Sequence, residues 1–257
     1  MTSFPKETET VLSATGLSRS FDDDPLIFED IDLVLKEGEF ASILGLSGSG
    51  KTTLFNILAG LDRPDAGSVT VKRKVGYMLQ KDLLLPWKRI IDNIALPYVL
   101  EGMSRRDARE KAGEFLPRFG LEGLERRFPS EVSGGQRQRA ALLRTYLYGG
   151  EILLLDEPFA GIDAITRKDL HVWIKSLQKE LGLTILLITH DLDEALALSD
   201  RIYVLSAGRP AALHPPVEVE EGKKDEALAT LVDLLYTTRE GIHLGAGSEK
   251  NGEVTER

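Results

Sequence analysis

The sequence has no cysteine among its 257 residues. It therefore forms no disulfide bond and uses no thiol in catalysis, and its composition is compatible with a reducing compartment. No apolar run approaches the roughly 18 residues that a membrane-spanning helix needs. The segment from Met1 to Thr10 is polar and carries both signs of charge, unlike a secretory signal. We expect a protein that is not integral to a membrane, although it can still dock on a membrane protein.

An excess of positive charge is also missing. The chain has 32 Lys and Arg against 41 Asp and Glu, which gives a net charge of −9. Such a balance disfavours a broad nucleic-acid-binding surface, and we expect no nucleic-acid partner. Charged residues at 28% and hydrophobic residues at 42% are ordinary for a globular protein. The length suits one large domain or two small ones.

The most informative stretch is a glycine-rich loop between a strand pattern over 40–44 and a helical pattern over 54–60. In this context the glycines let backbone N–H groups point inward at phosphate oxygens, and the helix dipole adds to the attraction. The competing interpretation is a turn that merely joins strand to helix. The loop supplies a mobile ammonium for the phosphates from Lys51 and a hydroxyl for Mg²⁺ from Thr52. The predicted phosphate-binding residues are Gly45, Leu46, Ser47, Gly48, Ser49, Gly50, Lys51, Thr52 and Thr53.

Two carboxylates end the apolar strand pattern over 152–155. Ligands of parallel sheets bind at the carboxyl ends of the strands, which is where Asp156 and Glu157 lie. Asp156 is suited to hold Mg²⁺, directly or through water. Glu157 faces differently and is suited to polarise an attacking water. The alternative is a pair of solvated acids without a catalytic role.

Two further polar residues follow predicted strands. His190 comes after the strand pattern over 184–188, where an imidazole can reach the γ-phosphate and the water. Gln80 comes after the short strand 75–78, and its amide can ligate Mg²⁺ and orient water. A structural histidine and an exposed loop glutamine are the competing interpretations.

A second glycine-containing helix start lies far from the first in sequence. Ser133 has the side chain of a good N-cap, and the glycines after it permit close approach of another group. Taken alone, Ser-Gly-Gly is consistent with an ordinary capped helix. With Gln136 and the arginines that follow, the segment predicts a second anion-binding site. Its residues are Ser133, Gly134, Gly135 and Gln136.

Elsewhere the chain alternates between strand and helix patterns. Strands are predicted over 11–14, 31–35, 69–71, 75–78, 152–155, 184–188 and 202–205. Helices are predicted over 164–181 and 225–236 and through most of 88–148. The long helical stretch interrupts the α/β pattern, which suggests a subdomain inserted into a nucleotide-binding core. We expect a flexible start over 1–10, a domain over 11–239 and a disordered tail over 240–257.

Together these residues resemble the ATP-binding subunit of an ATP-binding-cassette (ABC) transporter. The phosphate loop, Gln80, Ser133 to Gln136, Asp156-Glu157 and His190 occur in that family's order and at its usual spacing, within about residues 11–215. The resemblance implies an α/β fold with a P-loop NTPase (RecA-like) core, an antiparallel β subdomain and an inserted α-helical subdomain over about 88–148. It also implies hydrolysis of ATP with Mg²⁺ as cofactor.

The resemblance also assigns roles. Glu157 matches the general base, His190 the switch histidine, and Gln80 the residue that senses metal and water. Ser133 and Gly135 match the signature that closes over the γ-phosphate bound by a second copy of the chain. Two further residues complete the set, Phe21, which would stack on adenine unless it is a core phenylalanine, and Asp163, which would link the two sites across the dimer.

The chain departs from the family pattern at two places. Val132 stands where leucine is usual, which an apolar site tolerates. Ala160-Gly161-Ile162-Asp163 replaces the commoner Ser-Ala-Leu-Asp, and the missing hydroxyl is expected to weaken communication between the sites. Neither change removes a phosphate ligand.

Leu84-Leu85-Pro86-Trp87, with 92–97 after it, resembles importer ATPases of the nitrate, sulfonate and taurine group, which also includes pyrimidine carriers. The resemblance implies a peripheral protein on the cytoplasmic side of the cell membrane, bound to transmembrane permease subunits and indirectly to a substrate-binding protein. Leu84, Leu85 and Trp87 then form a docking patch, unless they belong to the core. An exporter or lipid-handling ATPase, a soluble ABC ATPase of DNA repair or translation, and a non-hydrolysing ATP-binding scaffold stay open as alternatives.

Overall fold

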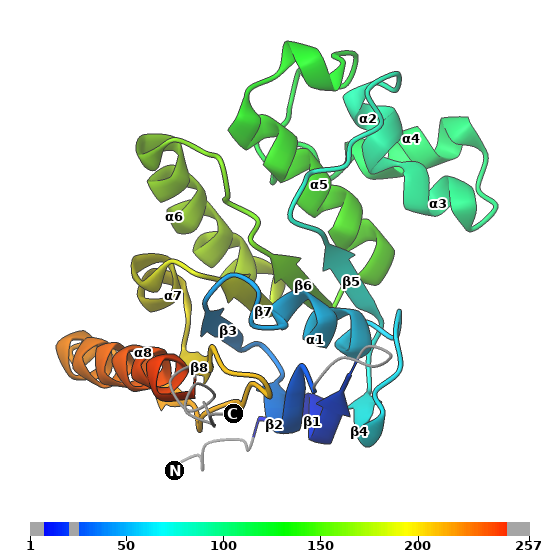
Figure 1. Ribbon diagram of the computed structural model, residues 1–257. Coiled ribbons are helices and arrows are strands. Elements are labelled where there is room, and N and C mark those ends of the chain that lie inside the picture. The colour runs from blue at the N-terminus through cyan, green and yellow to red at the C-terminus, as the bar shows by residue number, and fades with distance from the viewer. Residues whose placement is uncertain (1–7, 21–25, 246–257) are drawn as a thin grey trace, which may run out of the picture.

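The computed structural model describes residues 8–20 and 26–245, which form two sheets and the helices around them (Figure 1). The larger sheet has the order β5-β6-β7-β3-β8-β9, and its neighbours pair in parallel except β8 with β9. Its strands are β3 (Phe40–Gly45), β5 (Val75–Met78), β6 (Ile152–Asp156), β7 (Thr184–Thr189), β8 (Arg201–Leu205) and β9 (Val217–Glu218). Every residue of β3, β6, β7 and β8 is buried, which accounts for their mostly apolar character.

The smaller sheet is antiparallel and has the order β2-β1-β4. Its strands are β1 (Thr10–Arg19), β2 (Phe28–Lys36) and β4 (Ala66–Val71). In β2, Ile31, Leu33 and Leu35 are buried while the residues between them are exposed, the alternation of a sheet with one solvated face. One core cluster joins this buried face to β3 and to helix α1 (Lys51–Leu58). The small sheet therefore packs with the strand and the helix on either side of the glycine loop.

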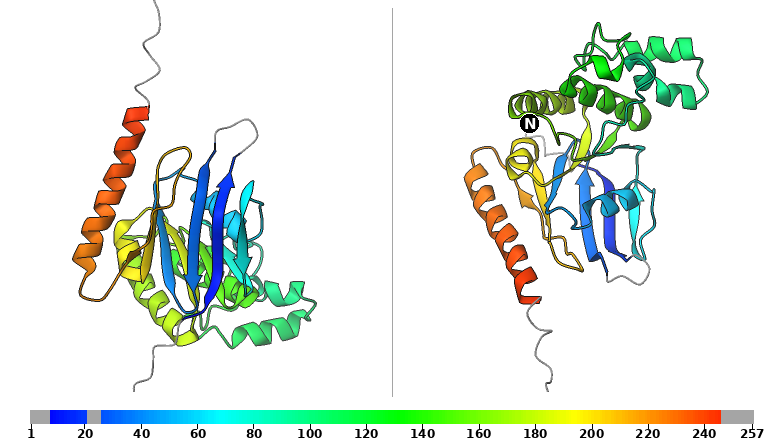
Figure 2. Two further views of the ribbon diagram at one scale, coloured as in Figure 1. Left: turned by 90° about the horizontal axis from the view of Figure 1, so that it is seen from below. Right: turned by 45° about the horizontal axis from the view of Figure 1, so that its top comes forward.

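The inserted helices gather at the end of the molecule away from β1, β2 and β4 (Figures 1 and 2). They are α2 (Ile90–Ile94), α3 (Leu96–Leu100), α4 (Arg105–Gly113), the 3₁₀ turn Pro129–Glu131 and α5 (Gly134–Gly149). A Cβ on Gly149 would lie 2.0 Å from the backbone N of Gly76, and one on Gly76 would lie 2.6 Å from the carbonyl O of Thr145. The two glycines therefore let α5 pack directly on β5, which fixes the insertion against the strand that leads to Gln80.

The remaining helices are α6 (Ala164–Leu181), α7 (Leu192–Leu198) and α8 (Lys224–Gly245). Figure 2 shows α8 on the outer side of the core, beside β8. It continues to Gly245 and so enters the range from residue 240 onward for which we expected disorder. Residues 246–257 lie outside the described residues, as do residues 1–7 of the expected flexible start. Within the described ranges, no helix combines the length and the apolar character needed to cross a membrane.

Candidate functional site

The glycine loop connects β3 to α1 and leaves the start of the helix open. Gly48 has φ +83° and Gly50 has φ +93°, in the left-handed region that glycine adopts without strain. Gly50 occupies the N-cap position of α1 and has no side chain with which to cap the first turn. A Cβ there would lie 2.6 Å from Ile27 Cγ2, so the position also requires glycine for space. The arrangement presents backbone N–H groups to an anion.

Lys51 is buried under this loop, with 6% of the residue exposed. Its Nζ donates to the carbonyl oxygens of Gly45 at 2.8 Å and Leu46 at 2.7 Å. Burial lowers the pKa of the Lys51 ammonium, while Glu157 and Asp156 oppose that shift. The Ser49 hydroxyl is also buried, and it has no hydrogen-bond partner within the described residues. A phosphate group would supply acceptors for both side chains, so the loop fits such a ligand.

Thr52 and Asp156 lie in contact although they are far apart in sequence. Thr52 Oγ1 donates to Asp156 Oδ2 at 3.0 Å, and the Tyr77 hydroxyl reaches the same oxygen at 3.5 Å. Burial raises the pKa of Asp156, and the hydrogen bond from Thr52 acts in the opposite direction. Burial also raises the pKa of Tyr77, which keeps its phenol a neutral donor. A hydroxyl beside a carboxylate is a donor set that Mg²⁺ accepts, so these residues fit the metal.

The carboxylate of Glu157 is held from two sides. Gln80 Nε2 donates to Oε2 at 3.2 Å, and His190 Nδ1 lies 3.2 Å from Oε1. The three residues follow β5, β6 and β7, which are neighbours in the sheet, so strand order brings them together. Glu157 itself has φ +46°, a left-handed conformation that is strained for a non-glycine residue. The backbone conformation that orients the Glu157 side chain is thus energetically unfavourable, as is frequent at functional sites.

Most of these residues line one pocket of about 370 Å³. Two of its residues, Ile27 and Arg209, were not predicted. Ala211 donates its N–H to the Ile27 carbonyl at 2.8 Å, and this pairing brings the nearby Arg209 to the loop. Nothing local in the sequence marks an arginine in a turn as part of a site. The lining residues are Ile27, Ser47, Gly48, Gly50, Lys51, Thr52, Thr53, Gln80, Glu157 and Arg209.

The residues of the second helix start do not line this pocket. Ser133 caps α5: its Oγ accepts from the Gln136 N–H at 3.2 Å, and Gln136 Oε1 accepts from the Ser133 N–H at 2.9 Å. A Cβ on Gly135 would lie 2.9 Å from Thr166 Cγ2, so this glycine lets α5 approach α6, whereas a Cβ on Gly134 would meet Arg137 Nη2 at an ordinary contact distance of 3.7 Å. Asp163 caps α6 by accepting from the Thr166 N–H at 3.0 Å. Phe21 lies outside the described residues.

The apolar segment after Gln80 divides between core and surface. Leu84 is buried, with 7% exposed, whereas Trp87 is 71% exposed and Leu83 50%. Leu83 also lines a pocket of about 200 Å³ together with Leu79, Pro97 and Leu100. The core interpretation is therefore correct for Leu84, while Leu83 and Trp87 are exposed, and of these two only Leu83 lines the pocket.

The fold and this site define an ATP-binding-cassette ATPase. The sequence profile described as "ABC transporter" matches residues 28–160, and the chain belongs to that family. The family and the observed sheets confirm the fold class that the resemblance implied, with a RecA-like core, an antiparallel β subdomain and an inserted helical subdomain.

Individual relatives show which ABC ATPases the chain is similar to. The chain is 41% identical over 198 residues to the formylaminopyrimidine import ATP-binding protein ThiZ of Halalkalibacterium halodurans, covering 76% of this chain and 80% of ThiZ. It is 43% identical over 204 residues to the aliphatic sulfonates import ATP-binding protein SsuB 2 of Streptomyces avermitilis, covering 79% of each. Among solved structures, the dimeric post-hydrolysis state of the cassette MJ0796 bound to ADP and Pi superimposes with a TM-score of 0.69 at 28% identity, covering 82% of this chain and 99% of that one.

Proposed function

We propose that this chain hydrolyses ATP to drive import of a small solute, with aliphatic sulfonates and formylaminopyrimidine as the first candidates and nitrate and taurine as further ones. The observation that carries the proposal is the Glu157 carboxylate, held between Gln80 and His190 beside the pocket of Lys51 and Thr52. The import direction and the solutes rest on similarity to ThiZ and SsuB.

The glycine loop and Lys51 bind the β- and γ-phosphates in this proposal. The loop N–H groups take the phosphate oxygens, and Lys51 exchanges its two carbonyl acceptors for phosphate. Thr52, Asp156 and the Oε1 of Gln80 would hold Mg²⁺, whose chemistry is to neutralise charge on the phosphate oxygens. Ile27 and Arg209 also line the pocket.

Glu157 is the proposed general base for the attacking water. A carboxylate accepts the proton of a water that Gln80 orients, and His190 donates a hydrogen bond to the γ-phosphate. Gln80 and His190 each contact one oxygen of the Glu157 carboxylate, so both side chains are placed to orient it and the water that it activates.

The second half of the site comes, we propose, from another copy of the chain. The Ser133 to Gln136 segment does not line the pocket of Lys51, and the related MJ0796 cassette is dimeric. In a head-to-tail dimer, the Ser133 helix start of one copy would face the γ-phosphate held by the other, with Asp163 between the two sites. ATP then stabilises the closed dimer because only the closed state engages the γ-phosphate from both sides.

The apolar patch beside Gln80 is the proposed docking site for a permease helix. Leu79, Leu83, Pro97 and Leu100 line the pocket of about 200 Å³, and Trp87 is exposed on the same loop. A membrane-subunit helix with apolar side chains would cover them. This contact would place the chain peripherally on the cytoplasmic side of the membrane, with a substrate-binding protein as an indirect partner.

Reconstitution tests the proposal. The chain is purified with its permease, placed in proteoliposomes with a substrate-binding protein, and supplied with ATP and a labelled aliphatic sulfonate or formylaminopyrimidine. We expect phosphate release coupled to uptake of one of these solutes. Phosphate release with efflux would favour an exporter, and absence of phosphate release would contradict the enzymatic proposal.

A further inference from the structure

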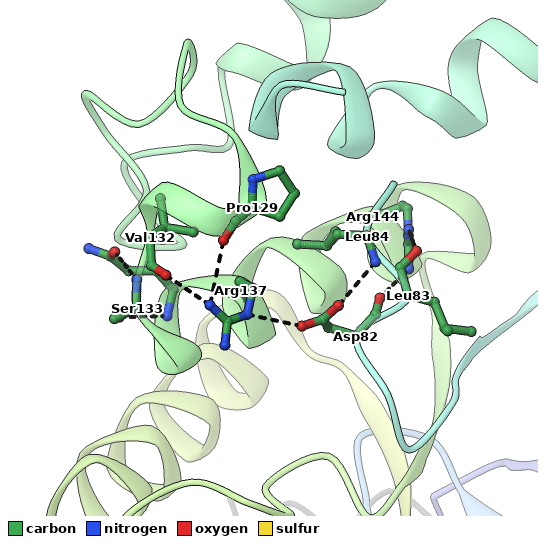
Figure 3. Close-up of polar contacts among 9 residues, drawn as sticks. Asp82, Leu83, Leu84, Pro129, Val132, Ser133, Arg137 and Arg144 are labelled. Atoms are coloured by element: carbon green, nitrogen blue, oxygen red, sulfur yellow. Dashed lines mark hydrogen bonds and ion pairs between the residues drawn. The ribbon is translucent and has the colours of Figure 1, made fainter. Parts of the chain in front are cut away.

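The loop that follows Gln80 is anchored to α5 by two arginines (Figure 3). Arg144 donates from one guanidinium nitrogen to the Leu83 carbonyl at 2.9 Å and from the other to the Asp82 carbonyl at 2.7 Å. Two bonds from one planar group fix the path of the backbone as well as its distance from the helix. The loop is thus attached to the helix that starts at Ser133.

Asp82 adds a second attachment through its side chain. Its Oδ2 accepts from Arg137 Nε at 3.2 Å, and its Oδ1 accepts from the Leu84 N–H at 3.1 Å. Between these contacts Leu83 has φ +44°, a left-handed conformation that leucine seldom adopts. Because the contacts of Asp82 and Arg144 bracket Leu83, they hold the loop in a conformation that the backbone would otherwise leave.

Arg137 carries the connection on to the start of α5. One guanidinium nitrogen donates to the Val132 carbonyl at 2.9 Å and reaches the Pro129 carbonyl at 3.5 Å. Val132 directly precedes Ser133, as Figure 3 shows. A continuous series of contacts therefore leads from Glu157 through Gln80, along the loop to Asp82, and through Arg137 to the residue before Ser133.

We propose that Asp82, Arg137 and Arg144 are positioning residues that make the Gln80 loop and the Ser133 helix start move as one unit. Gln80 contacts the base of one nucleotide pocket, while Ser133 serves the pocket of the second copy, so the unit links the two sites of the dimer. The link between sites rests on the proposed head-to-tail dimer, whereas the link within one chain rests only on the contacts above.

The control is an ion pair of the same subdomain. Arg109 Nε donates to Asp92 Oδ1 at 2.7 Å between α4 and α2, and neither residue contacts the Gln80 loop or the Ser133 helix start. The variant Asp92→Asn therefore weakens the subdomain without breaking the series. The test variants are Asp82→Ala, Arg137→Met and Arg144→Met, and none of these positions lines the nucleotide pocket.

The first measurement is hydrogen exchange of the nucleotide-free chain. In Asp82→Ala and Arg137→Met we expect amides of both 80–88 and 129–137 to exchange about tenfold faster, the effect of losing one charge-assisted hydrogen bond. Asp92→Asn should leave both segments unchanged. A change confined to one segment, or an equal change in the control, would overturn the link within the chain.

The second measurement is the ATP dependence of phosphate release. We expect the wild type to show a Hill coefficient above 1, and the three test variants to approach 1 while nucleotide affinity at concentrations too low for dimers stays within about twofold, because the pocket is intact. A wild-type Hill coefficient of 1, or variants that keep the wild-type coefficient, would overturn the link between sites. If the wild type releases no phosphate, the proposed function fails, and the exchange measurement alone decides the link within the chain.

Discussion

The two glycine-containing helix starts of this chain are built differently. α1 begins after Gly50, which offers no cap, so its first-turn N–H groups are available to a ligand. α5 begins after Ser133, whose hydroxyl and Gln136 satisfy each other's backbone N–H groups. The first start suits an anion that is bound within one chain. The second is already stable alone, and since the Ser133 Oγ only accepts, its own proton is left to donate to an incoming phosphate.

The largest expected effect comes from the base beside the first helix start. Glu157→Gln keeps the shape of the side chain and removes the proton acceptor. Phosphate release should fall by about 100-fold or more, the usual range for loss of general-base catalysis. ATP binding should persist, and the trapped dimer should appear by size-exclusion chromatography. Normal turnover would remove Glu157 from the base role.

Lys51→Met tests whether the buried ammonium binds phosphate. The variant keeps the apolar stem and removes the donor, so nucleotide affinity should fall by about 10- to 100-fold, as for a charge-assisted hydrogen bond. Titration with a fluorescent ATP analogue measures the change. Lys175→Met is the control, because Lys175 contacts Asp200 away from the pocket. Equal affinities in Lys51→Met and wild type would show that the loop alone binds phosphate.

Two substitutions at Ser133 separate the capping role from the ligand role of the second start. Ser133→Ala should lower the free energy of unfolding by about 1 kcal/mol, the usual cost of losing an N-cap. Ser133→Asp keeps a capping oxygen but has no proton to donate and repels phosphate, so stability is retained while the ATP-bound dimer is lost. Urea unfolding and light scattering with ATP measure the two effects. A Ser133→Asp chain that dimerises normally would leave Ser133 with capping as its only role.

The smallest expected effect comes from Arg209, which lines the first pocket but belongs to none of the sequence motifs. Arg209→Gln should weaken nucleotide binding by about two- to fivefold, the range for one exposed charge. High salt should reduce the difference between the variant and the wild type. An effect that does not depend on salt would point to a change in packing of the turn.

Buried strands and long helices were the predictable part of the fold. β5 and α6 have the predicted bounds, and β3, β6, β7 and β8 each differ from the prediction by one residue at one end. Apolar runs specify these strands, and a helical periodicity sustained over 18 residues specifies α6. α7 was missed because its seven residues are too few to show a clear helical periodicity. α8 continues beyond 236 into the range expected to be disordered. Local composition thus described the buried elements better than it described the chain's end.

The residues of the site also differ in how well the sequence predicted them. Gln80, Glu157 and His190 follow neighbouring strands, and their meeting could be expected from the topology of a parallel sheet. Ile27 and Arg209 reach the site through pairing of distant segments, for which the sequence offers no local signal. The cap that Ser133 forms was predictable from its residue type. Its proposed partner is in another copy, which one chain does not contain.

The most direct measurement of the central claim uses the absence of cysteine from the chain. Cysteines introduced at Ser47, which is exposed in the phosphate loop, and at Ser130, which is exposed three residues before Ser133 and leaves the Ser133 hydroxyl in place, would be the only thiols present. In an ATP-trapped Glu157→Gln background, a short thiol crosslinker should join two copies, and it should fail to do so with ADP or without nucleotide. If the trapped assembly never crosslinks between these positions, the two helix starts do not share a nucleotide, and the account of a head-to-tail dimer is wrong.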